Sequence, residues 1–291
     1  MKPAPFEYAA PESVEEVLEL LGEHGEEAKV LAGGQSLGPL LNMRLATPGV
    51  LVDINRVEGL SYLRSGDDVL AVGALARQRS IERSISIPRR WPLLHQAAPY
   101  IGHVAIRNRG TICGSLAHAD PAAELPAVAV ALGARLRIRG ARGEREVEAG
   151  DFFVNYMTTD LAPDELLVEA RFPPLPPRTG TSWKEVARRH GDFALVGVAA
   201  VVTLARDGRC ERVRLVYTGV APTPFEAGDA EEMLSGESPT QELFGEAAER
   251  AARDCEPGSD VHASAAYRRH LVRVLTKRAL GEAVRRAREE G

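Results

Sequence analysis

Two short glycine-containing segments have residue types and spacing that could bind a phosphate: AGGQS at residues 32–36 and GTICGS at residues 110–115. Glycine has no Cβ, so its backbone can adopt positive φ and can approach a ligand closely. Backbone N–H groups that converge at such a turn form an anion site, to which the hydroxyls of Ser36, Thr111 and Ser115 could add donors. Two such turns in one domain suit a ligand with two phosphates.

Neither segment matches a common nucleotide motif. Gln35 stands where G-x-G-x-x-G requires its second glycine, and no Gly-Lys-Ser/Thr sequence follows either segment. A pair of glycines more often makes only a tight turn. From spacing alone, therefore, the two segments support a phosphate-site hypothesis and nothing more specific.

Composition narrows the function classes. The 291 residues carry a net charge of −5 with both signs mixed, which argues against nucleic acid as a partner. Cys113, Cys210 and Cys255 are far apart, and they have no spacing typical of a zinc or iron–sulfur site. The N-terminus lacks the apolar core of a signal peptide, and no run of about 20 apolar residues could span a membrane. We expect a cytoplasmic protein without a metal site of its own.

The first glycine segment is predicted to lie inside a β-α-β unit. AKVL at 28–31 indicates a short buried strand, SLGPLLNMRLA at 36–46 a short helix, and VLVDINRV at 50–57 a second strand. A helix is predicted before this unit, where Ser13 can cap the segment and Glu16 can complete a capping box. Gly22 and Gly25 are expected to end that helix.

The rest of the chain mixes strands and helices. ARLRIRG at 134–140 is predicted to pair with EREVEAG at 144–150, and a further strand is expected at 164–172. The proline cluster at 173–177 marks a domain boundary. Beyond it, three strands with an RDGR hairpin signal and a long final helix indicate an antiparallel sheet covered by helices, which gives an α+β class overall.

Four ordered motifs carry a family resemblance over nearly the whole chain: AGGQSLGPLLNMRLATP, IRNRGTICGSLAHADPAAELPA, RRHGDFALVGVAAVV and SAAYRRHLVRVL. Together they resemble the flavin-binding medium subunit of the molybdenum hydroxylases, the family of carbon monoxide dehydrogenase and xanthine dehydrogenase. The resemblance implies a two-part flavin-binding domain of the PCMH type at 1–176, with lobes at about 1–57 and 58–176. A C-terminal domain at 177–291, with its antiparallel sheet and helices, would follow.

The resemblance also implies a set of FAD-binding residues. The first flavin loop of the family has the pattern A-G-G-x-S, and the second has T-I-G-G-[NS]. In the second loop Cys113 replaces the first glycine of the pair; because cysteine favours negative φ, we expect an ordinary backbone there. The matching residues are Ala32, Gly33, Gly34, Gln35 and Ser36 in the first loop, with Val30, Leu31 and Leu37 lining it, and Thr111, Ile112, Gly114 and Ser115 in the second.

Four further positions follow from the resemblance. Glu124 matches an acidic residue that bonds ribityl or adenosine hydroxyls, with Asp120 as the alternative. Ile101 matches a residue packed near the cofactor, and Leu167, or else Leu166, matches a leucine that contacts the flavin ring. Phe193 matches an aromatic residue that shields one face of the isoalloxazine.

Each of these positions also has a purely structural interpretation. Glu124 could simply be an acid favoured at a helix N-terminus. Phe193 could be ordinary core at the domain junction. Arg107 and Arg109 flank the second loop, where they could neutralise phosphate or be solvated on the surface.

The resemblance implies a division of labour between chains. This chain would hold FAD, a large subunit would hold molybdopterin and hydroxylate the substrate, and a small subunit would hold two [2Fe–2S] clusters. Electrons would pass from the clusters to FAD and on to an external acceptor, in an assembly that is commonly a dimer of heterotrimers, and no catalytic side chain is expected here. The alternatives are a self-contained flavin oxidoreductase of the related fold and a flavin-free assembly protein.

Overall fold

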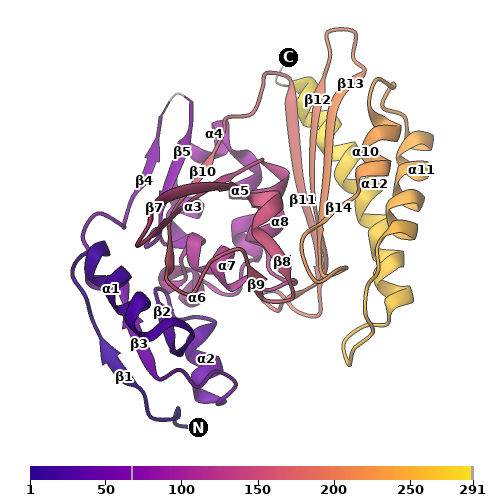
Figure 1. Ribbon diagram of the computed structural model, residues 1–291. Helices are drawn as coiled ribbons and strands as arrows, with labels where there is room; N and C mark the ends of the chain where they lie inside the picture. The colour runs from indigo at the N-terminus through magenta and orange to yellow at the C-terminus, as the bar shows by residue number, and fades with distance from the viewer. Residues whose placement is uncertain (67, 290–291) are drawn as a thin grey trace.

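The computed structural model describes residues 1–66 and 68–289, which form three main β-sheets with helices packed between and around them (Figure 1). No helix in the described part of the chain is long and apolar enough to cross a membrane. The proposed lobe boundary at 57/58 falls between the first and second sheets, and the proposed domain boundary at 176/177 falls between the second and third.

The first sheet is small and parallel, with strand order β1-β3-β2. The predicted β-α-β unit is present as β2, α2 and β3, whereas β1 was not predicted. The helix before the unit begins as expected, because the Ser13 side chain accepts from the Glu16 N–H at 3.2 Å. It ends at Gly25, where φ is +51°; Gly22 lies inside it, so the prediction that Gly22 helps to end the helix was wrong. The elements are β1 (Glu7–Ala9), α1 (Val14–His24), a 3₁₀ turn (Gly25–Glu27), β2 (Ala28–Leu31), α2 (Leu37–Asn42), β3 (Val50–Asp53) and a 3₁₀ turn (Ile54–Arg56).

The second sheet is antiparallel, with strand order β4-β5-β10-β6-β7. The predicted hairpin of β6 and β7 is confirmed, with Gly140 opposite Gly143. Its strands are β4 (Leu63–Ser65), β5 (Leu70–Gly73), β6 (Arg135–Gly140), β7 (Gly143–Glu148) and β10 (Glu165–Phe172). The helices of this region are α3 (Gln78–Arg83), α4 (Ile87–Arg90), α5 (Pro92–Ala97), a 3₁₀ turn (Ala98–Tyr100), α6 (Val104–Arg109), α7 (Ile112–His118), α8 (Glu124–Ala131) and α9 (Ala149–Phe152); β8 (Phe153–Asn155) and β9 (Thr158–Thr159) form a small ribbon.

The third sheet is antiparallel as predicted, with order β11-β12-β13-β14. Strand β12 is buried along its whole length because alternate side chains face two different cores. Ala199 and Val201 join the core of the first domain, whereas Val198 and Val202 pack under the C-terminal helices. The elements are β11 (Thr179–Ala187), β12 (Ala194–Leu204), β13 (Cys210–Thr218), β14 (Phe225–Glu226), α10 (Gly228–Leu234), α11 (Gln241–Asp254) and α12 (Ala265–Glu289).

The third sheet therefore lies between two layers of helices. Helices α5 and α8 of the first domain lie against it on one side, and α10, α11 and α12 cover the other (Figure 1). Because α8 follows closely after the second glycine segment, this packing ties that segment to the C-terminal domain.

Candidate functional site

The two glycine segments lie against each other in the fold. The first loop, residues 32–36, joins β2 to α2, and the second loop, residues 110–115, leads from α6 into α7. A Cβ on Gly33 would stand only 2.8 Å from the Cα of Gly110, so backbone fills the space that a side chain would need. Glycine at position 33 is therefore a steric requirement and not only a turn preference.

Two amide side chains orient the peptide groups of the first loop. The Ala32 carbonyl accepts from Asn55 Nδ2 at 2.7 Å, and the Gly33 carbonyl accepts from Gln35 Nε2 at 2.9 Å. In a trans peptide the C=O and N–H point in opposite directions, so the N–H groups of Gly33 and Gly34 point away from these amides. Within residues 1–66 and 68–289, neither N–H donates to a protein acceptor. This pair of N–H groups fits an anion such as a phosphate.

The hydroxyls of the two loops have different roles. Thr111 caps α7, because its Oγ1 accepts from the Gly114 N–H at 3.1 Å. Ser36 stands at the corresponding position of α2 but makes no cap bond. Neither the Ser36 nor the Ser115 hydroxyl bonds another residue in the described part of the chain. The two serine hydroxyls are therefore available to a ligand.

The cysteine in the second loop points away from the first loop. Cys113 lies in the first turn of α7, so its backbone is helical, as expected from the sequence. Its thiol is buried and donates to the Val72 carbonyl on β5 at 3.6 Å, and burial raises the pKa of the thiol to about 12. Its neighbour Ile112 is also fully buried in the core. Cys113 is thus a core residue here, whereas Gly114 faces the first loop, with Ala32 Cβ 4.0 Å from the place of a Cβ.

Ile101 and Phe193 lie on neighbouring segments although they are far apart in sequence. Gly191 has φ of +88°, and a Cβ there would stand 2.5 Å from Cε1 of His103. The segment that carries Phe193 therefore packs against the residues just after Ile101. The Phe193 side chain is 63% exposed, so its interpretation as ordinary core is wrong.

Glu124 begins α8 and is buried, with 6% of its surface exposed. Burial raises its pKa to about 7. A second carboxylate, Glu185 on β11, accepts from Trp183 Nε1 at 3.2 Å. Burial and then the charge of Glu124 raise the pKa of Glu185 to about 8. Sequence reasoning missed Glu185, which lies on a strand that shows no motif around it.

The segment before α8 is held by the C-terminal domain. Thr218, at the end of β13, donates to the carbonyls of Pro121 at 2.6 Å and Ala123 at 2.9 Å. Asp120 accepts from the Ala122 N–H at 2.8 Å, so one of its oxygens shapes this turn.

Arg107 is neither a phosphate ligand nor a solvated surface residue. It is 4% exposed, and its Nε donates to Glu82 Oε2 at 2.9 Å. Its Nη1 donates to the carbonyls of Ile101 at 2.9 Å and Gly102 at 3.0 Å. Both sequence interpretations of Arg107 were wrong, because the side chain shapes the segment after Ile101. Arg109 is exposed.

The remaining candidates are apolar. Leu167 lies on β10 opposite Ile138 of β6, and both Leu167 and Leu166 are buried in the core of the first domain. The half-buried Val30, Leu31 and Leu37 flank the first loop. Contact of Leu167 or Leu166 with the flavin ring, and of the other three residues with the pyrophosphate loop, stays a prediction.

Sequence reasoning also missed a polar chain that connects the two loops. Asn55, which bonds the Ala32 carbonyl, also accepts from Arg77 Nη2 at 2.7 Å. Arg77 Nη1 in turn donates to the Arg109 carbonyl, beside the second loop, at 2.6 Å. Asp53 fixes Asn55 through a bond of 2.6 Å. The only sequence signal was the pair of polar residues Asp53 and Asn55 at the end of a buried strand.

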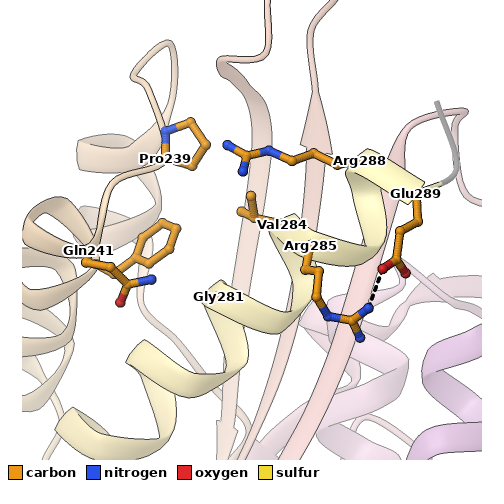
Figure 2. A pocket seen from close by; sticks show the side chains of 8 residues that line it. Pro239, Gln241, Gly281, Val284, Arg285, Arg288 and Glu289 are labelled. Atoms are coloured by element: carbon orange, nitrogen blue, oxygen red, sulfur yellow. Dashed lines mark hydrogen bonds and ion pairs between the residues drawn. The ribbon is translucent and has the colours of Figure 1, made fainter.

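Two cavities in the described part of the chain lie away from the loops. One has a volume of ≈ 290 Å³ and lies between the start of α11 and the last turns of α12. Figure 2 shows residues that line it, such as Gln241, Val284 and Arg288. Another of ≈ 270 Å³ lies between α5, β11 and α12. Neither contains a predicted flavin-binding residue. The chemistry of the loops, and not cavity size, marks the candidate site.

Comparisons with known proteins match this arrangement. Residues 4–175 match the family described as FAD binding domain in molybdopterin dehydrogenase, and residues 181–283 match the CO dehydrogenase flavoprotein C-terminal domain. The chain belongs to this family. Relatives include the carbon monoxide dehydrogenase medium chain of Hydrogenophaga pseudoflava and a putative xanthine dehydrogenase FAD-binding subunit of Escherichia coli. The chain is thus a medium FAD subunit of the molybdenum-hydroxylase type of dehydrogenase, an oxidoreductase, and the resemblance drawn from the four motifs is confirmed.

Individual relatives are similar over their full lengths. The chain is 43% identical over 288 residues to the 6-hydroxypseudooxynicotine dehydrogenase complex subunit alpha of Paenarthrobacter nicotinovorans, covering 99% of this chain and 97% of the relative. Among solved structures, carbon monoxide dehydrogenase from Hydrogenophaga pseudoflava gives a TM-score of 0.95 at 38% identity, covering 98% of this chain and 99% of that one. Quinoline 2-oxidoreductase from Pseudomonas putida 86 gives 0.93 at 36% identity, covering 99% of each chain. The expected fold is confirmed.

Proposed function

We propose that this chain carries electrons from the [2Fe–2S] clusters of a partner subunit to an external acceptor, such as NAD, quinone or oxygen, through FAD held at its two glycine loops. Family membership supports the cofactor. The observation that carries the proposal is the pair of unpartnered N–H groups at Gly33 and Gly34, in a loop that packs on the start of the second one. They suit a pyrophosphate because they are two consecutive N–H donors of partial positive charge that no acceptor in the described part of the chain uses.

Each group of candidate residues has a proposed part in holding FAD. The N–H groups of Gly33 and Gly34 and the Ser36 hydroxyl would bind the pyrophosphate, and Gly114 and Ser115 would approach it from the other side. Glu124, or else Asp120, would bond ribityl or adenosine hydroxyls. The other candidates would surround the cofactor. Val30, Leu31, Ala32, Gln35 and Leu37 would line it at the first loop, Thr111 and Ile112 would approach it through their backbone at the second, Ile101 would pack near it, and Leu167 and Phe193 would contact the ring.

Bound FAD would supply the redox chemistry, because a flavin takes up and releases electrons singly or in pairs. The protein contributes position and electrostatics. The exposed Phe193 would cover a planar ligand with its own ring, and the half-buried loops would limit the water that reaches the phosphates.

The proposed partners are a molybdopterin-containing large subunit and a small subunit with two [2Fe–2S] clusters, in a dimer of heterotrimers. Relatives support a multi-subunit setting, since their names describe a medium subunit, a medium chain or a subunit of a dehydrogenase complex. The substrate would be oxidised on the large subunit. A cytoplasmic location stays a prediction.

A visible spectrum of the purified chain tests the flavin proposal. We expect flavin bands in the protein as purified or after addition of FAD. Absence of these bands even with added FAD would leave the flavin-free assembly protein as the better interpretation. If the chain alone, without molybdenum or iron, oxidised a small substrate, the self-contained oxidoreductase would replace the subunit proposal.

A further inference from the structure

We propose that Arg77 and Asn55 are positioning residues for FAD: together they brace the two loops at a fixed separation and turn the first loop's N–H groups toward the ligand. The inference rests on the proposed FAD site and deepens it, because neither residue belongs to a flavin-loop motif. Both lie outside the two loops, so they would act through the backbone that they hold.

The brace is a continuous series of hydrogen bonds. It runs from the Ala32 carbonyl to Asn55 Nδ2 at 2.7 Å, from Asn55 Oδ1 to Arg77 Nη2 at 2.7 Å, and from Arg77 Nη1 to the Arg109 carbonyl at 2.6 Å. In the described part of the chain, no hydrogen bond joins the first loop directly to the second. The side chains of Asn55 and Arg77 are thus the polar link between them.

Arg77 is anchored on the second loop by its own backbone. It forms an antiparallel bridge with Thr111, flanked by the bonds from Gln78 N to Gly110 O at 2.9 Å and from Ile112 N to Ala76 O at 3.2 Å. Its guanidinium then reaches to Asn55, next to the first sheet. Movement of either loop relative to the other would have to break this link.

The link also decides which way a peptide group faces. While Asn55 holds the Ala32 carbonyl, the Gly33 N–H points the opposite way. Without that bond the peptide between residues 32 and 33 could turn and present its carbonyl oxygen to the ligand. An oxygen lone pair facing a phosphate repels it, so the loss would appear as weaker binding of the diphosphate.

Arginine suits this position better than lysine. The planar guanidinium donates in two directions at once, to a side-chain oxygen and to a backbone carbonyl, whereas an ammonium is a single point of charge. If only the positive charge of Arg77 mattered, the Arg77→Lys variant would bind FAD as tightly as the wild type. If the two bridging hydrogen bonds matter, this variant should bind FAD more weakly.

The test is FAD affinity of the full chain, measured by flavin fluorescence during titration of the deflavinated protein. The variants are Arg77→Met, Arg77→Lys and Asn55→Asp; the aspartate keeps the acceptor for Arg77 but loses the donor to Ala32. The matched control is Arg56→Met, which removes the charge of the exposed neighbour of Asn55 and no bond of the brace. Thermal unfolding of every variant reports whether it is folded at the assay temperature.

We expect each of the three brace variants to weaken FAD binding by about tenfold, as the loss of one good hydrogen bond implies, and Arg56→Met to change it by less than about twofold. Combining Arg77→Met with Asn55→Asp should weaken binding no further than the worse single variant, because both break the same link. The inference would be overturned if Arg77→Lys or Asn55→Asp bound FAD with wild-type affinity. It would also be overturned if the losses of FAD affinity were fully additive in the double variant. Failure of the wild-type chain to bind FAD would instead overturn the proposed function.

Discussion

The two glycine loops use similar residues but are stabilised in different ways. The second loop is ordered locally: Thr111 caps α7 by accepting from Gly114 N–H, and the helix follows at once. The first loop has no such cap, since the Ser36 side chain makes none. It depends on Gln35 from within and on Asn55 from outside.

The different stabilisation of the two loops shows that a hydroxyl residue next to a glycine does not by itself indicate whether the hydroxyl stabilises the fold or binds a ligand. At the second loop the threonine hydroxyl accepts a hydrogen bond that caps a helix, whereas at the first loop the serine hydroxyl makes no such bond. Substitutions in the two loops should therefore separate stability from FAD affinity.

The largest effect is expected at the contact between the loops. Gly33→Ala would place a Cβ 2.8 Å from the Gly110 Cα, so the loops must separate. We expect a loss of about 1–3 kcal/mol in the free energy of unfolding. FAD affinity should fall by about 100-fold, as an equivalent loss of binding energy implies. Gly38→Ala is the matched control, because no atom lies within 4 Å of its added Cβ. If the two variants had the same free energy of unfolding in urea and the same FAD affinity, the close contact between Gly33 and Gly110 would be contradicted.

The second prediction concerns the buried carboxylates that follow the second loop. The folded-state pKa values of Glu124 and Glu185 lie above the ordinary value of 4.5, at about 7 and about 8. The folded state therefore holds more protons, so stability is fully present below about pH 4.5 and falls as pH rises through about 7 to 8. Between about pH 5 and pH 8 we therefore expect the free energy of unfolding of the wild type to decrease, because each carboxyl loses its proton while it is still buried.

Glu185→Gln should flatten this decline, and urea unfolding across the pH range measures it. The first loop has no comparable buried pair, so Asp53→Asn, next to that loop, serves as the comparison. Burial by itself raises the Asp53 pKa, but hydrogen bonds from Asn55 and Tyr8 outweigh it and lower the pKa below its ordinary value. An undiminished decline in Glu185→Gln would show that another group is responsible.

Thr111→Val tests the local order of the second loop. Valine keeps the shape but loses the cap bond to Gly114, so the free energy of unfolding should fall by about 1 kcal/mol. Urea unfolding of the deflavinated chain is the measurement. A variant as stable as the wild type would mean that the cap does not contribute to the fold.

Ser36→Ala should give the reverse result at the first loop. Since the serine makes no cap bond, the free energy of unfolding should change by less than about 0.5 kcal/mol. FAD affinity should fall about fivefold, because one hydrogen bond to the pyrophosphate is lost. If Ser36→Ala destabilised the protein and Thr111→Val did not, the proposed difference between the two loops would be wrong.

Much of the local structure could be read from the sequence because it depends on neighbours in the chain. The Ser13 cap, the β-α-β unit around the first loop and the β6–β7 hairpin each follow from a few adjacent residue types. The position of a helix end depends on more than the presence of a glycine. Gly22 lies inside α1, because a glycine at that place has open space and the following residues continue the helix.

Side-chain roles that depend on distant residues were missed or misread. Arg107 bonds Glu82, 25 residues away in sequence, and Asn55 bonds Ala32, 23 residues away. Glu185 gains its raised pKa from burial and from Glu124, which lies in the other domain. None of these contacts leaves a periodic pattern in the sequence, so only the folded chain shows them.

The sequence by itself determined the two loops, the strands and helices that flank them and, through its four motifs, the family. These depend on backbone conformation and on short runs of residues, which local chemistry dictates. Only the tertiary structure decided that the loops touch at Gly33, that Arg77 and Asn55 brace them and that Phe193 is exposed, because sheets from different parts of the chain had to pack before those residues could meet.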